Sequence, residues 1–371
     1  IHHDFVDVSG QMRVNTQIID AQGAELTYEA DGQTFHLALS FESQGGAPFF
    51  GQPLFTVEVR EDQVRGQVSS SRVFVDNGGG VDKKNEFLAL VDHYEVTTTP
   101  CDGITLLQID ETFLPTNSNA AIEAIPSYHT EQLKEGEGNV IWTIYLKNGD
   151  TLRLRHTVKI TRVPVVTLTE NDYPMATVDD LNVLLDTLAH EADRKSVYIL
   201  QLPAVTYEGG LTMKNFCCDL VGSEGGTTFT GTVTIATRGI HPSNITNVRF
   251  MGDGTGIGLS ASEGAFLHRC TFENWEIGAY GGLGSWVNAT GCTFRGNGVG
   301  LWLDNHGGAT CSGSYYGDSV YEDNGTAVRI AAMPGTETLD FNNCVFRGNG
   351  VNVENTAGYA VDLSQIVTAD N

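Results

Sequence analysis

The stretch CTFRGNGVGLW, residues 292–302, contains the pattern that decides the fold: an aromatic residue, a polar turn and an apolar strand. Related copies are CTFENWEIGAY at 270–280 and CVFRGNGVNVE at 344–354, with shorter copies at Val248-Arg249-Phe250 and Ser319-Val320-Tyr321. The aromatic residues of the five copies lie 22, 22, 27 and 25 residues apart. Such a period is typical of stacked coils, in which each coil buries its apolar face only against its neighbours.

Aligning the copies on the aromatic residue separates inward from outward positions, because side chains alternate along a strand. One inward column lies five residues before the aromatic residue and contains Ile245, Leu267, Ala289, Tyr316 and Phe341. A second lies two residues before it and contains Val248, Cys270, Cys292, Ser319 and Cys344. We predict three short strands per coil, with turns near Asn247, Arg269, Gly291, Asp318 and Asn343. The aromatic residues Phe250, Phe272, Phe294, Tyr321 and Phe346 should form one stacked column.

This pattern resembles the right-handed parallel β-helix of the pectate-lyase-like superfamily over about residues 177–365. The resemblance implies an all-β fold with about six coils from about 196 to 365 and a polysaccharide as the substrate or ligand. Enzymes of the superfamily use paired carboxylates for hydrolysis, or an arginine or lysine base with calcium for β-elimination. An enzymatic activity would therefore be that of a glycoside hydrolase or a polysaccharide lyase. No adjacent Asp-Asp pair lies on a coil strand, and the chain lacks the Gly-His-Gly and Arg-Ile-Lys motifs of these enzymes, so the resemblance leaves catalysis open.

Two further regions precede the coils. Residues 177–192 have helical periodicity and a capping-box-like start at Thr177 and Asp180, and we expect this helix to cover the open end of the coil stack. Residues 1–168 contain alternating strands and an Asn148-Gly149-Asp150 hairpin signal, which predict an antiparallel β-sandwich-like region of one or two modules. The division falls at 168/169, with residues 164–174 as a linker and Gly78–Gly80 as a candidate internal boundary.

Polar columns of the coils have structural interpretations. Asn297, Asn324 and Asn349, with Asp253 in the same place in another copy, predict an asparagine ladder at a turn. Glu273, Arg295, Glu322 and Arg347 alternate in charge along one outer column and predict cross-strand ion pairs. Cys270, Cys292 and Cys344 should be reduced core residues, and we place Cys218 in the same column one coil earlier.

The composition limits the partners. A net charge of −25 disfavours nucleic acid and anionic lipid, and no apolar run approaches a membrane span, so we expect a soluble protein without membrane insertion. Acidity and fold class favour a secreted or cell-surface protein. The chain begins at Ile1 rather than at methionine, from which we expect that a signal peptide or tag was removed, with His2-His3 a remnant rather than a metal site. No motif indicates a metal or cofactor; calcium and oligomerisation stay open.

The candidate site lies where outward aromatic residues and a long coil meet. Tyr280, Trp302, Arg329 and Glu354 share one outward column, and the extra residues of the longest coil form a loop from Asp304 to Asp318. We expect Tyr280, Trp302, Arg329, Asn305 and Tyr315 to bind a sugar chain, and Asp304, His306 and Asp318 to supply acid or base groups. The structural alternative is that the loop merely covers Trp302 or meets the N-terminal module or another subunit. Two other functions stay open: a structural or tail-spike-like stalk, and a scaffold that presents an N-terminal interaction module.

Overall fold

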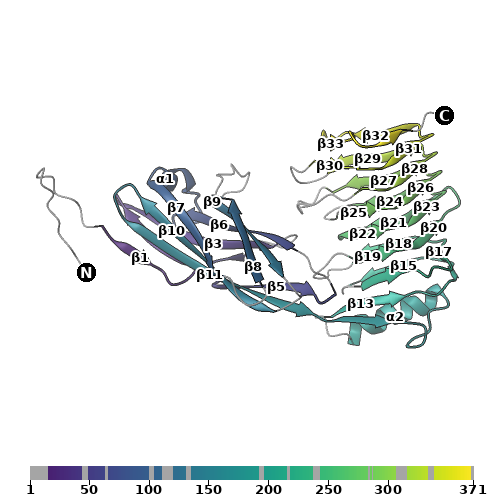
Figure 1. Ribbon diagram of the computed structural model, residues 1–371, viewed down its shortest axis with the longest axis horizontal. Helices are drawn as coiled ribbons and strands as arrows, with labels where there is room; N and C mark the ends of the chain where they lie inside the picture. Colours follow the sequence, from purple (N-terminus) through teal and green to yellow (C-terminus); the bar gives the residue numbers. More distant parts are fainter. Residues whose placement is uncertain are drawn as a thin grey trace, which may run out of the picture. The chain divides into compact units, whose positions relative to one another are not determined.

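The computed structural model describes residues 16–43, 49–62, 66–99, 104–110, 120–130, 135–191, 196–214, 218–236, 243–282, 285, 287–305, 316–332 and 338–368. The chain divides into two compact units, Ile1–Arg162 and Val163–Asn371 (Figure 1). Each unit has a large hydrophobic core of its own.

The N-terminal unit consists of two sheets with mostly antiparallel pairing. The first contains β1 (Ile18–Asp20), β5 (Leu54–Arg60), β7 (Val91–Thr99), β10 (Gly136–Leu146) and β11 (Thr151–Val163), in the order β1-β11-β10-β7 with β5 on β11. The second contains β2 (Glu25–Ala30), β3 (Gln33–Ser43), β4 (Phe49–Phe50), β6 (Gly66–Asp76), β8 (Ile104–Asp110) and β9 (Ala120–Thr130). Helix α1 (Lys84–Leu88) follows β6. The predicted hairpin joins β10 to β11, and Gly149 provides the positive φ of 94° that its turn requires.

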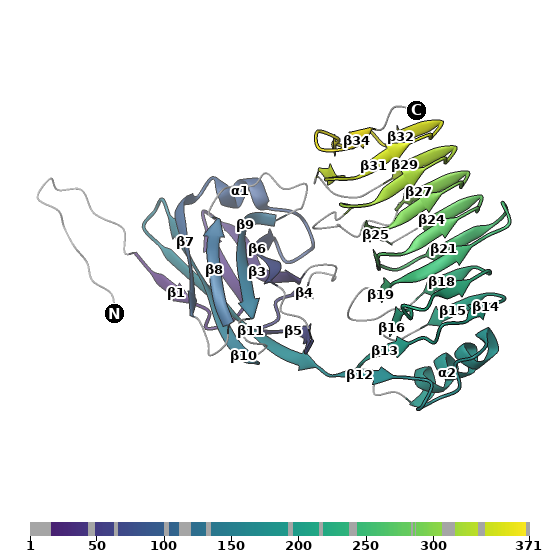
Figure 2. The same cartoon turned by 45° about the vertical axis from the view of Figure 1, so that its right-hand side comes forward.

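The C-terminal unit is a stack of coils built from three parallel sheets (Figure 2). The first coil sheet contains β12 (Val165–Leu168), β13 (Val197–Gln201), β16 (Cys218–Val221), β19 (Ser243–Thr246), β22 (Ala265–His268) and β25 (Val287–Thr290). The second contains β14 (Thr206–Tyr207), β17 (Thr227–Phe229), β20 (Val248–Met251), β23 (Thr271–Glu273), β26 (Thr293–Arg295), β28 (Val320–Glu322), β31 (Val345–Arg347) and β34 (Val367–Thr368). The third contains β15 (Leu211–Lys214), β18 (Val233–Ala236), β21 (Ile257–Ala261), β24 (Ile277–Gly281), β27 (Val299–Asp304), β29 (Thr326–Ala332) and β32 (Val351–Asn355). A short pair, β30 (Leu339–Asp340) and β33 (Val361–Asp362), lies near the C-terminal end.

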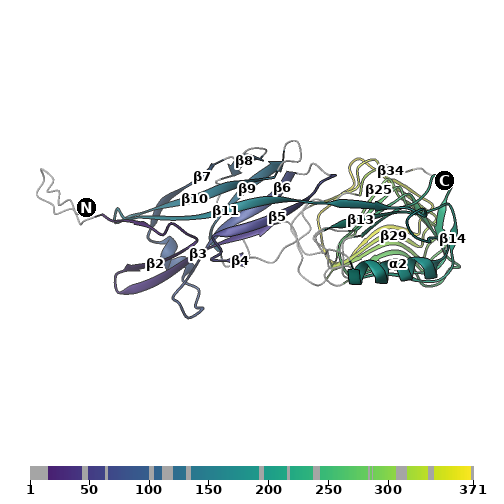
Figure 3. The same ribbon diagram turned by 90° about the horizontal axis from the view of Figure 1, so that it is seen from below.

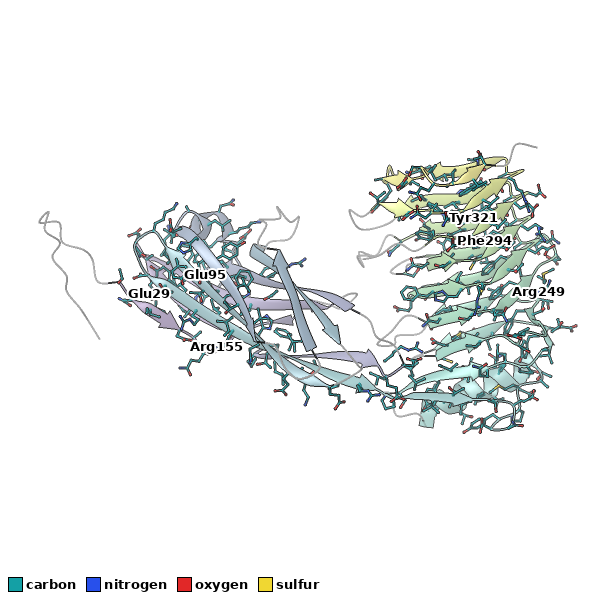
Figure 4. All side chains as sticks on the ribbon, in the orientation of Figure 1. Glu29, Glu95, Arg155, Arg249, Phe294 and Tyr321 are labelled. Atoms are coloured by element: carbon teal, nitrogen blue, oxygen red, sulfur yellow. The ribbon has the colours of Figure 1, made fainter. Side chains whose placement is uncertain are left out.

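The predicted aromatic column forms the centre of this core. Ring centroids of neighbours from Phe250 to Phe346 lie 4.5 to 5.0 Å apart, and their planes differ by no more than 11°. Phe294 and Tyr321 are labelled in Figure 4. Tyr207 and Phe229 extend the same column toward the N-terminal end of the unit. The prediction of the column is confirmed, and the stack is longer than the sequence copies indicated.

The turns between the first and second coil sheets also lie where the sequence placed them. Asn247, Arg269, Gly291, Asp318 and Asn343 all have φ between 52° and 63°. This left-handed conformation is strained for most side chains and is adopted most readily by glycine and asparagine. The corner therefore repeats one backbone geometry on successive coils, even where arginine occupies it.

Side-chain ladders connect the coils. The Nδ2 of Asn297 donates to Oδ1 of Asn324, and the Nδ2 of Asn324 donates to Oδ1 of Asn349, each at 3.0 Å. Outside the core, Glu322 pairs with both Arg295 and Arg347 at 2.8 Å. The asparagine ladder thus follows its predicted column. The charge ladder forms ion pairs at Arg295, Glu322 and Arg347, whereas Glu273 is aligned with Arg295 in the strand register.

Three details differ from the sequence expectation. Asp253 is exposed, and its carboxylate accepts hydrogen bonds from Thr255 rather than joining the asparagine ladder. The ladder ends at Asn297, whose side-chain oxygen Oδ1 accepts a hydrogen bond from the backbone N–H of Trp275. Residues 165–168, expected in a linker, form β12 and pair with β13.

The third difference concerns the cysteines. Cys270, Cys292 and Cys344 are buried and free, as predicted, and Cys218 is buried and free as well. However, Cys218 lies in the first coil sheet, where the register aligns Leu220 with Ile245. The position aligned with Val248 is held by Thr227. The assignment of Cys218 to the other column was wrong, because the aromatic residue of its coil is Phe229 and not a residue near Leu220.

Helix α2 (Val178–Glu191) packs on the first coils. Leu181, Leu184, Leu185 and Leu188 are buried in the same core as Tyr207 and Leu211. The reciprocal bonds of the capping box form at its start, from Thr177 N to Asp180 Oδ2 at 2.9 Å and from Asp180 N to Thr177 Oγ1 at 3.1 Å. Seen from below, α2 crosses in front of the coil stack (Figure 3).

Candidate functional site

The outward column of the third coil sheet carries the predicted aromatic residues. The strand register places Tyr280, Trp302, Arg329 and Glu354 on four consecutive strands, β24, β27, β29 and β32. Together with Asp304 these residues are named the Trp302 surface. The Tyr280, Trp302, Arg329 and Asp304 side chains are half-buried, and each therefore presents part of its surface to solvent.

Contacts along the column fix these side chains. The rings of Tyr280 and Trp302 meet edge to face with centroids 5.5 Å apart. On the next strand, Cζ of Arg329 lies 4.6 Å from the centroid of the Trp302 ring, a cation–π distance. Arg329 Nε in turn donates to Glu354 Oε2 at 2.7 Å. The column is consequently ordered by its own contacts before any ligand is present.

Asp304 lies at the end of β27, two residues after Trp302 and therefore on the same outward side of the strand. The pairing of β27 with β29 shifts register just before it, so that Asp304 aligns with Ala332. Its Oδ2 accepts a hydrogen bond of 2.9 Å from the hydroxyl of Tyr280. Burial, and then this carboxylate, raise the pKa of Tyr280, so its hydroxyl stays a donor at neutral pH.

The remaining predicted site residues lie elsewhere or outside the described residues. Asn305 follows Asp304 but is buried, with only 3% of its surface exposed, and its backbone N–H bonds to Ala332 O. Asp318 occupies the turn before β28, at the corner between the first and second coil sheets, and accepts a hydrogen bond of 3.3 Å from Asn343. His306 and Tyr315 lie outside the described residues. Tyr316, expected to turn inward, is fully buried and stacks on Phe341.

Glu354 shares this column but was not among the predicted site residues. Its place eight residues after Phe346 was the available signal, since the same spacing gives Tyr280, Trp302 and Arg329. In the part of the chain that the structure describes, no group of three or more His, Cys, Asp or Glu side chains is arranged to hold a metal ion. Polar and ionic groups flanking aromatic rings are therefore what this surface offers a ligand.

Comparison with known proteins bears on the coil unit. Residues 228–366 match the family model described as right handed beta helix region. The C-terminal unit is a right-handed β-helix. A family 28 exopolygalacturonase of Yersinia enterocolitica is a similar solved structure, with 9% identity, a TM-score of 0.29, and coverage of 81% of this chain and 77% of that chain. No curated protein matches the chain.

Among the described residues, no helix has the length and apolar character needed to cross a membrane.

Proposed function

We propose that the β-helix unit binds a polysaccharide at the Trp302 surface. The observation that supports this most directly is the contact-fixed column of Tyr280, Trp302, Arg329 and Glu354 on consecutive strands. Neighbouring strands of a sheet are about 4.8 Å apart, so the column offers a regular row of aromatic and charged groups along the coil axis. A chain of repeating units matches such a row better than a single small molecule does.

The chemistry of the row suits a sugar. Aromatic rings contact the apolar faces and edges of sugar rings, while carboxylates and guanidinium groups bond to hydroxyls. Arg329 covers one face of Trp302, so the ligand would meet the outward edge of the indole together with the Arg329 and Asp304 groups. Because the side chains are already held in place, little conformational entropy is lost on binding.

Replacement of the tryptophan tests this proposal. Trp302→Ala should weaken binding to a glycan found by array screening by about 1–3 kcal/mol, since the ring and the position of Arg329 are lost together. Tyr173→Ala is the matched control, because Tyr173 is an exposed aromatic residue, 37% accessible, in a different part of the unit. Equal binding by the parent, Trp302→Ala and Tyr173→Ala would refute the proposal. Cleavage, by either hydrolysis or elimination, is assayed on the same glycan through new reducing ends and unsaturated products.

A structural role as an extracellular stalk is the second candidate. The ladders of stacked rings, asparagines and Glu–Arg pairs favour it, because each adds rigidity between coils without offering a reactive group. The acidic composition is compatible with secretion under either function. A stalk predicts that no glycan binds and that Trp302→Ala only lowers stability.

A further inference from the structure

The outward face of the first coil sheet carries a different set of polar side chains. One outward column contains Asp219, Asn244, Phe266 and Asn288, as the register of β16, β19, β22 and β25 shows. The column beside it contains Thr246, His268 and Thr290. None of these residues belongs to the repeated sequence pattern or to the Trp302 surface. Their core-facing neighbours, such as Ile245, Leu267 and Ala289, are fully buried.

Asp219 organises the first of these columns. Asp219 is 4% exposed, and its carboxylate accepts a hydrogen bond of 2.8 Å from the backbone N–H of Asn244. The Nδ2 of Asn244 lies 3.3 Å from both carboxylate oxygens. Since a carboxylate can only accept hydrogen bonds when ionised, this contact assigns the amide nitrogen of Asn244 to the Asp219 side.

The orientation of Asn244 determines the role of His268. With Nδ2 turned to Asp219, the amide oxygen Oδ1 faces Nε2 of His268 at 3.3 Å. An amide oxygen only accepts, so the imidazole must carry a proton on Nε2. In the neutral ring, Nδ1 is then the nitrogen that accepts a hydrogen bond or a proton.

We propose that this face is a second saccharide-binding site, in which Asn244, Phe266 and His268 contact the hydroxyls and ring of the sugar. The inference deepens the proposed polysaccharide function but uses a different surface. Asn244, Phe266 and His268 are half-buried, whereas Asp219 is buried and acts as a positioning residue. The ring of Phe266 lies beside the amide of Asn244, the imidazole of His268 and the hydroxyls of Thr246 and Thr290, so one apolar surface is combined with hydrogen-bonding groups. Asn288, on the other side of Phe266, is only 3% exposed and is not part of the surface.

The other two outward faces lack this combination among the described residues. The second coil sheet presents threonines and the Glu–Arg ladder, and the third presents the Trp302 surface. His268 therefore adds to this face a hydrogen-bonding group whose tautomer is set, through Asn244, by a buried carboxylate.

Binding by the full chain distinguishes the two surfaces. Phe266→Ala and His268→Ala should each weaken binding to a glycan from the array at least about tenfold, and Thr271→Ala, on the outward face of the second coil sheet, should not. If only Trp302→Ala weakens binding, the second site is refuted and the proposed function stands. If Phe266→Ala and His268→Ala weaken it and Trp302→Ala does not, the first coil sheet is the site and the Trp302 surface is not. Array binding by none of the proteins refutes both.

The tautomer of His268 tests the positioning role of Asp219 separately from ligand binding. Ring-nitrogen NMR of ¹⁵N-histidine-labelled protein, with the His268→Gln spectrum for assignment, should show the Nε2–H form for His268. Asp219→Asn should give a mixture of tautomers, because its own amide no longer fixes the orientation of Asn244. Circular dichroism identifies folded variants, and Asn244→Leu replaces Asp219→Asn should that variant unfold. A Nδ1–H form in the parent, or an unchanged ring spectrum in the folded variant, would refute the positioning role of Asp219.

Discussion

Buried asparagine side chains form hydrogen bonds that join one coil to the next. Asn324 is 2% exposed, and its Oδ1 accepts from both the backbone N–H and the Nδ2 of Asn297, each at 3.0 Å. Its Nδ2 donates to the carbonyl of Phe294 at 2.9 Å. A buried backbone group that loses its partner costs free energy even though a typical hydrogen bond contributes little net stability.

Asn324→Ala should therefore lower the free energy of unfolding by about 2–4 kcal/mol, since the Asn297 N–H and the Phe294 carbonyl lose the partners that Asn324 supplies. Urea denaturation followed by circular dichroism measures this. Asp253→Ala is the matched control, because Asp253 has the same place in an earlier coil but is exposed and bonds only locally. Similar losses in the two variants would show that the ladder adds no stability.

The buried thiols give a second prediction at this scale. Burial raises the pKa of Cys344 to about 11, which leaves almost no reactive thiolate at neutral pH. Alkylation in buffer should leave Cys218, Cys270, Cys292 and Cys344 unmodified, and alkylation in guanidinium should modify all four. Peptide mapping by mass spectrometry separates these sites from the other cysteines. Disulfide-linked peptides containing any of the four would contradict the structure.

At the scale of the element, the Glu–Arg ladder ties three strands of the second coil sheet together. Glu322 on β28 is the middle member, paired with Arg295 on β26 and Arg347 on β31. Hydrogen bonds from Arg347 and Arg295 lower the pKa of Glu322 below its ordinary 4.5. The folded state therefore binds this proton less tightly than the unfolded state, and the stabilisation is present above pH 4.5 and is lost as the pH falls through the lowered pKa.

Glu322→Gln should lower the melting temperature slightly at neutral pH, consistent with about 0.2–1 kcal/mol for each partly exposed pair. Calorimetry from neutral to acid pH should show the difference from the parent shrinking as the pH falls below 4.5. High salt should shrink it as well, because exposed charges are screened. A difference that is independent of both pH and salt would mean that Glu322 acts through packing instead.

At the scale of the whole molecule, the chain has two units with separate cores, Trp142 being central to one and the aromatic column to the other. Unfolding should therefore occur in two steps, because no single core has to be broken at once. Calorimetry of the full chain should show two transitions, of which only one is retained by a fragment comprising residues 163–371. One concerted transition for the full chain, with an unfolded fragment, would contradict this.

The sequence predicted most of the structural features that repeat from coil to coil and few of the features that occur once. Phe250 to Phe346, the five left-handed turn residues and the asparagine ladder follow from a period, since each coil imposes its register on the next. Cys218 was misplaced because no copy of the pattern marks its coil. For the site, the column of Tyr280, Trp302 and Arg329 followed from spacing. The Tyr280 to Asp304 bond joins side chains of two different strands, and the Asp219 to His268 chain spans three strands; spacing along the sequence does not reveal such contacts.

The aromatic column also explains how coils of unequal length share one stack. Phe294 and Tyr321 are 27 residues apart in the chain, yet their ring centroids are 5.0 Å apart, the same separation as for Phe272 and Phe294 across a shorter coil. The extra residues after Asn305 leave the spacing of the core unchanged. The stack therefore accommodates a change in chain length between Asn305 and Tyr316. A peptide inserted there would add new side chains to the sequence that follows Trp302 while the spacing of the core stays the same.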